Sequence, residues 1–177
     1  TNSLLVGTDS TGTLSSADEN TGVGIGVLAA LTSGDNNVAV GKNSLTANTT
    51  GSNNVSVGRQ SLDANTTGQK NTAVGQGALG ANTTANDNTA VGNSALLANT
   101  TGNSNTAVGQ GSSQTGTTAS DNVSVGFCSL YSVTTGGANV ALGACALKSN
   151  TTAVHNTAVG KDALEANTTG ACNTAVG

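Results

Sequence analysis

The stretch Asn71-Thr72-Ala73-Val74-Gly75 decides the fold, because it returns every 17 residues without a slip. The same five residues begin again at Asn88, Asn105, Asn156 and Asn173, and close variants fill the places between. A fixed short period indicates that each unit is one turn of a stacked structure and not a separate domain. We therefore predict a single repeat domain over residues 1–177.

The unit reads N-[TV]-[AS]-V-G-x-x-[AS]-L-x-A-N-T-T-G-x-x, with its Asn numbered as position 1. β-Branched residues alternate with a small residue at positions 2 to 4, which predicts a strand, and a second short strand fits positions 8 to 11. Gly at position 5 and the Asn-Thr-Thr-Gly run at positions 12 to 15 predict turns, since Gly and Asn tolerate positive φ. The recurring Gly and the abundance of Thr and Asn disfavour long helices.

These patterns predict an all-β fold, a single parallel β-solenoid (β-roll) of about ten 17-residue coils with two short strands per coil. Seventeen residues bury nothing alone, but stacked coils repeat each apolar side chain at the same place. We expect Val at position 4 and Leu at position 9 to form two inward columns. A coil spacing of about 4.8 Å gives a rod of about 50 Å.

Charged residues are few and concentrate at positions 6, 7, 10, 16 and 17, which we expect to face water because buried charges are costly. The remaining positions are expected to point inward or to form turns. The net charge of −4 comes without a basic stripe, so nucleic-acid binding has no support. No apolar run is long enough to predict a membrane span.

Two of the three cysteines occupy equivalent positions. Cys128 and Cys145 both stand at position 7, in adjacent units, where stacked Cα atoms should lie about 4.8 Å apart, within the range of a disulfide. We predict a disulfide between these coils, with two free thiols as the alternative; the bond would indicate an oxidising, extracellular compartment. Cys172, at position 17, has no stacked cysteine partner. It either forms a disulfide with another subunit or stays a free thiol.

The Asn at position 1 is predicted to form an amide ladder, each side chain bonding to the next coil. The ladder comprises Asn20, Asn37, Asn54, Asn71, Asn88, Asn105, Asn122, Asn139, Asn156 and Asn173. A second Asn, at position 12, begins Asn-Thr-Thr in most units. It either serves the turn or, in a source that glycosylates such sites, accepts a glycan.

Catalysis has little support in the sequence. The single histidine, His155, stands at a variable outward position, and a solvated face accounts for Asp162 and Glu165 on one coil. One histidine and three spread cysteines provide neither a Ser-His-Asp set nor a metal-ligand cluster. We therefore expect no enzyme, no cofactor and no metal site.

Two surface features could contact a partner. Phe127 and Tyr131, at outward positions of one unit, predict a contact patch. Stacked threonines at position 13 resemble the rows of ice-binding β-solenoids, although adjacent strand residues point to opposite faces, so only one Thr column is displayed. This column is Thr49, Thr66, Thr83, Thr100, Thr117, Thr134, Thr151 and Thr168.

The segment Ala73-Val74-Gly75-Gln76-Gly77-Ala78-Leu79-Gly80-Ala81 resembles the head repeats of YadA-type trimeric autotransporter adhesins and the repeats of phage tail fibres. The resemblance covers nearly the whole chain. It implies a left-handed parallel β-roll, often trimeric, that serves as an adhesive or spacer shaft on a cell or virion surface.

These observations together predict a structural protein of an extracellular fibre: an adhesin head, a tail-fibre shaft, or a filament subunit that stacks end to end. The expected partners are further copies of the chain, as a trimer or a filament, and a host-surface receptor. End-to-end stacking is suggested because neither end unit shows a polar cap. The alternative function is ice binding through the Thr column.

Overall fold

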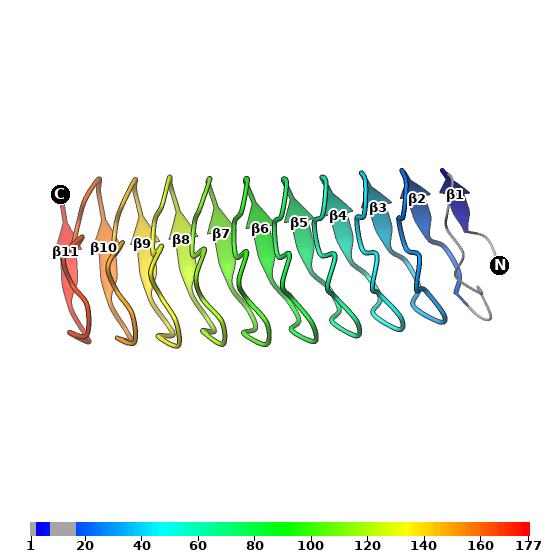
Figure 1. Ribbon diagram of the computed structural model, residues 1–177. Helices are drawn as coiled ribbons and strands as arrows, with labels where there is room; N and C mark the ends of the chain where they lie inside the picture. The colour runs from blue at the N-terminus through cyan, green and yellow to red at the C-terminus, as the bar shows by residue number, and fades with distance from the viewer. Residues whose placement is uncertain (1–2, 8–16) are drawn as a thin grey trace.

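In the computed structural model, which describes residues 3–7 and 17–177, the chain is an all-β solenoid with one parallel sheet of eleven strands. The strands stand side by side in chain order, and β1 and β11 lie at opposite ends of the rod (Figure 1). They are β1 (Leu4–Val6), β2 (Thr21–Val23), β3 (Val38–Val40), β4 (Val55–Val57), β5 (Thr72–Val74), β6 (Thr89–Val91), β7 (Thr106–Val108), β8 (Val123–Val125), β9 (Val140–Leu142), β10 (Thr157–Val159) and β11 (Thr174–Val176).

The strand pairing follows the sequence period. Thr72 pairs with Thr89 and Thr89 with Thr106, so each residue stands beside its equivalent 17 positions later, and the same register holds from β1 to β11. The predicted parallel solenoid is confirmed. Because every coil advances by one strand spacing, ten intervals of about 4.8 Å give a rod about 48 Å long.

The second strand predicted at positions 8 to 11 is wrong wherever the structure describes that segment, from residue 27 onward, because each of those coils has one strand and the segment is a turn. Residues at positions 7 and 9 adopt left-handed backbone conformations, as in Ser94 (φ 56°) and Leu96 (φ 51°). A third such residue stands at position 17, as in Asp87 (φ 59°). Left-handed residues interrupt an extended backbone and are costly for non-Gly side chains, so they persist only where packing and hydrogen bonds impose them.

Gly at position 5 is required by close contact between coils. A Cβ built at Gly75, which has φ 137°, would lie 2.4 Å from the carbonyl oxygen of Gly92 in the next coil. The chain can therefore leave each strand only through a residue without a side chain.

The prediction that Val at position 4 points inward is also wrong: this column faces solvent, and position 3 is buried in its place. Ala90 is fully buried, while its neighbour Val91 is 36% exposed. The reason is the thinness of the coil, because the Leu column at position 9 lies directly across from the sheet. A Cβ built at Gly22, a position 3 residue, would lie 2.6 Å from Leu5 of the preceding coil and already touch Leu28 at 3.5 Å. A larger side chain has no room there, and Gly, Ala or Ser occupies position 3 from Gly22 to Ala175.

The predicted ladder at position 1 is present and buried. Asn88 donates from its backbone N–H to the side-chain oxygen of Asn71 at 3.1 Å, and its own side-chain oxygen accepts from the backbone N–H of Asn105 at 2.9 Å. Its Nδ2 donates to the carbonyl of Gly102 at 2.9 Å, which closes its own coil. From Asn20 to Asn139, each Asn thus ties its own coil together and joins it to both neighbours.

The second Asn, at position 12, forms a shorter ladder inside the turn. Asn82 donates to the side-chain oxygen of Asn65 at 2.8 Å and to the carbonyl of Ala85 at 3.2 Å. Both asparagines are fully buried, so the turn role explains them and a glycan has no access to them in the folded chain, whereas Asn167 in the last full coil is half-exposed.

Asn88→Ala should destabilise the protein strongly, because it leaves Gly102 and Asn105 without their buried partners, at about 1–3 kcal/mol for each unsatisfied group. Urea unfolding measures the change. The matched control is Asn93→Ala in the same coil, since Asn93 is exposed and only accepts from Ser94. Equal effects of the two substitutions would contradict the stabilising role of the ladder.

Candidate functional site

The outer face of the sheet carries an uncharged strip that runs along the described rod. We call it the valine strip; it consists of the outward residues of all eleven strands, at positions 2 and 4. These are Leu4, Val6, Thr21, Val23, Val38, Val40, Val55, Val57, Thr72, Val74, Thr89, Val91, Thr106, Val108, Val123, Val125, Val140, Leu142, Thr157, Val159, Thr174 and Val176. None of them is buried. A long apolar surface of this kind marks an interaction site more often than a scattered apolar residue does.

The Thr column at position 13 is stacked as predicted, but its hydroxyl groups are engaged within the protein. The Thr49 hydroxyl donates to the carbonyl of Thr66 at 3.0 Å, and the Thr66 hydroxyl to that of Thr83 at 3.0 Å. The same bond recurs along the column from Thr83 to Thr168. These hydroxyl groups therefore serve to hydrogen-bond each coil to the next.

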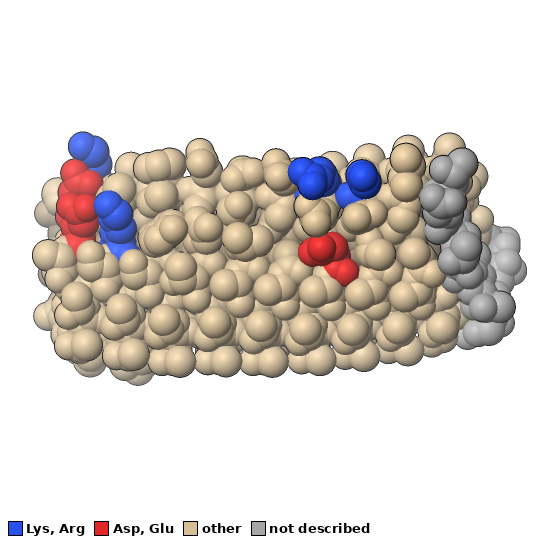
Figure 2. All heavy atoms as spheres, in the orientation of Figure 1, with Lys and Arg blue, Asp and Glu red and all other residues tan. Residues whose placement is uncertain are grey.

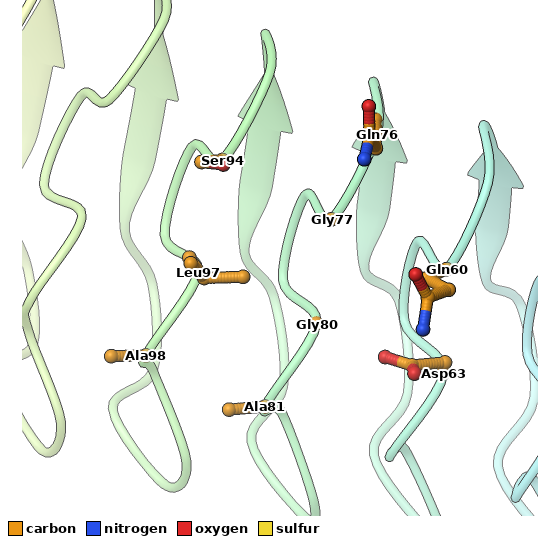
Figure 3. A pocket seen from close by; sticks show the side chains of 9 residues that line it. All are labelled: Gln60, Asp63, Gln76, Gly77, Gly80, Ala81, Ser94, Leu97 and Ala98. Carbon is orange, nitrogen blue, oxygen red and sulfur yellow. The ribbon is translucent and has the colours of Figure 1, made fainter.

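On the turn side of the rod, a hollow of about 600 Å³ opens where the coil that begins at Asn71 has glycine at two outward positions. Gly77 and Gly80 leave the space, and Ala81, Ala98 and Leu97 line its apolar part (Figure 3). Polar groups from Gln60, Asp63, Gln76 and Ser94 complete the lining. A carboxylate and two carboxamides beside an apolar floor suit a small ligand with both polar and apolar parts.

Asp63 is the charged group of this hollow. Burial raises the pKa of its carboxyl above the ordinary 3.8, against a lowering by hydrogen bonds from the backbone N–H groups of Asp63 and Ala64. The site therefore holds a carboxylate that is less well solvated than one on an open surface.

The cysteines lie where the repeat places them. Cys128 and Cys145 are half-buried in adjacent coils and Cys172 is exposed; all three are free thiols, and the disulfide between the first two stays a prediction. Burial and the neighbouring Cys145 raise the pKa of the Cys128 thiol, while Lys148 lowers it.

The two residues of the predicted contact patch differ in their exposure to solvent. Phe127 is 54% exposed, whereas Tyr131 is half-buried. Ile25, which the sequence interpretation passed over, is an exposed apolar residue at the same position 6.

The structure gathers one group that the sequence interpretation missed. The ligand atoms of Cys145, Asp162 and Glu165 all lie within 4.8 Å of one another. Two lysines accompany them, with Lys148 Nζ at 3.5 Å from Glu165 and Lys161 Nζ at 3.2 Å from Asp162. The available signal was that Cys145 and Asp162 share position 7 in adjacent units.

Charged side chains gather at two places on the face shown in Figure 2, near β3 and β4 and near the end formed by β10 and β11. His155 is exposed at position 17 and lines neither the hollow nor the group around Cys145.

Comparison with protein-family models, with curated proteins and with solved structures finds no match for the chain. Within residues 3–7 and 17–177, no helix has the length and apolarity needed to cross a bilayer.

Asp63→Asn should stabilise the protein at pH 7 and leave it unchanged well below pH 3.8. The raised pKa means that the folded chain holds the proton more tightly than the unfolded chain, so ionisation costs stability as the pH rises through this range. Urea midpoints at the two pH values measure the effect. Asp87→Asn, at an exposed position, changes the net charge equally and serves as the control. A pH-independent difference between Asp63→Asn and the native protein would contradict the burial argument.

Proposed function

We propose that the chain is a structural module of an extracellular fibre, a stiff spacer or adhesive shaft without a catalytic role. The observation that carries the proposal is the uninterrupted ladder of eleven parallel strands, tied internally by buried asparagines. Such a rod is long and stiff, because the coils stack on their neighbours in one register along the whole rod. The resemblance to adhesin-head and tail-fibre repeats supports the same role.

Lateral association of several copies is part of this proposal, and the valine strip is the surface that supports it. The strip is about 50 Å long and, with two columns about 7 Å apart and the width of their side chains, about 11 Å wide. Two facing strips would therefore bury roughly 1,100 Å², just above the roughly 1,000 Å² expected of a biological interface.

The strip of a second copy of the chain has the same spacing between side chains, so the two strips match along their length. Its side chains repeat at the same strand spacing, so they can interdigitate along the entire rod, as in packed sheets. The strip has no charged residue, so pairing two copies leaves no unpaired charge in the interface.

Val91→Lys, at the middle of the strip, should shift the protein towards the monomer, since a lysine in the paired interface would be buried without a partner. Analytical ultracentrifugation over a concentration series measures the shift. Thr101→Lys, at an exposed position of the turn, adds the same charge away from the strip and should leave association unchanged. Monomeric native protein at high concentration would contradict lateral association.

Ice binding remains a second candidate, and one observation favours it on a face other than the predicted Thr column. The threonines of the valine strip, such as Thr72, Thr89 and Thr106, are half-exposed and stand in register with one another. Among the described residues, their hydroxyl groups make none of the coil-to-coil bonds that occupy the position 13 threonines. A regular, uncharged array of methyl and hydroxyl groups is a surface on which ordered water can be held.

Thermal hysteresis separates the two functions. Under the ice-binding function, native protein and Thr101→Lys should depress the freezing point below the melting point, and Val91→Lys should abolish the gap. Absence of hysteresis in the native protein would remove this candidate and leave the fibre proposal standing.

A further inference from the structure

The position 7 column is a rigid scaffold for side chains near the C-terminal end of the rod. Its backbone N–H groups donate to the preceding coil, as from Cys145 to Phe127 at 2.9 Å and from Asp162 to Ala144 at 2.9 Å. Cys128, Cys145 and Asp162 also share one left-handed conformation, with φ 51°, 58° and 59°. Equal backbone geometry and even spacing make their side chains leave the column in parallel.

This parallel arrangement bears on what the two cysteines can do. Pure translation by one strand spacing separates their Cβ atoms by about 4.8 Å, as it does their Cα atoms. A disulfide accepts such a Cα distance but prefers Cβ atoms about 3.5–4.5 Å apart. A shared metal ion needs an approach just as close, since two sulfurs that each lie about 2.3 Å from one ion are at most about 4.6 Å apart. The two cysteines are therefore not a metal site by themselves.

Carboxylates complete a set of donors at the same place. The turn after Asp162 returns Glu165 to it, with the Glu165 N–H donating to the Asp162 carbonyl at 3.1 Å. The Sγ of Cys145 and the carboxylates of Asp162 and Glu165 then lie within 4.8 Å of one another, whereas Cys128 stands two strand spacings from Asp162, outside this group. We propose that Cys145, Asp162 and Glu165 bind a zinc ion, with the fourth coordination position open to solvent.

The donor set suits zinc in its chemistry. Zn²⁺ takes thiolate sulfur and carboxylate oxygen together and prefers four ligands, whereas Mg²⁺ and Ca²⁺ prefer oxygen alone.

The two lysines do not block the site. The pair between Lys148 and Glu165 is partly exposed, with 43% and 45% of the side chains accessible, and Lys161 is 77% accessible. Ion pairs at such exposure contribute little to stability, so a metal ion can replace them on the carboxylates. The lysines are long enough to turn into solvent when the ion binds.

The test uses the full chain, reduced with a phosphine, and titrated with Co²⁺ as a spectroscopic probe followed by Zn²⁺. We expect one equivalent of Co²⁺ to produce a thiolate-to-cobalt charge-transfer band, and Zn²⁺ to displace it and raise the melting temperature. Cys145→Ser and Asp162→Asn should each weaken binding at least about tenfold, the smallest loss expected even for an outer partner of a metal site.

Cys128→Ser should bind like the native chain, since Cys128 stands two strand spacings from Asp162, outside the donor group. Cys172→Ser and Asp35→Asn, which change a thiol and a carboxylate outside the group, should bind like the native chain. The proposal is overturned if the native protein gives no charge-transfer band, or if Cys145→Ser leaves the band unchanged.

Discussion

The rest of the structure depends on the buried amide of the position 1 asparagine. A coil of 17 residues has many backbone groups and little apolar side-chain volume, so its interior must satisfy polar groups as well as exclude water. Asn88 does both, because it bonds to Asn71, Gly102 and Asn105 and is fully buried. Asp would bring a charge into the interior, and Ala would leave these partners unpaired.

The coil that this ladder closes is thin, and its thinness decides which side chains lie on the surface. Leu96 fills the interior from the turn side, so the facing strand can turn only a small residue, Ala90, inward. The larger side chains of the strand are displaced to the outside, where Val91 and its equivalents form the valine strip. A surface that favours association is therefore a consequence of how little space the core has.

The rod has distinct local features where its sequence departs from the repeat. Glycine at two outward positions opens the hollow beside Asp63, and a cysteine at position 7, Cys145, stands next to Asp162 of the following coil. The coil that begins at Asn105 has Ser113 in place of the core leucine, and the apolar core is divided there into two clusters. Ser113 Oγ in this coil and Asn99 Oδ1 in the coil before it are buried without a hydrogen-bond partner, so the break lacks both the apolar contact and part of the hydrogen bonding of the other coils.

The sequence by itself determined the period, the parallel register, the Asn ladder and the stacking of Cys128 on Cys145, because translation by 17 residues brings equivalent residues together whatever the shape of the coil. The shape itself was decided only by the tertiary structure. Whether Ala90 or Val91 faces inward depends on the distance across the coil, and alternation along a strand is the same for either choice. The turn at Leu96, read from the sequence as a strand, depends on a left-handed residue that packing and hydrogen bonds impose. The meeting of Cys145 with Glu165 likewise arises from that turn and not from the repeat alone.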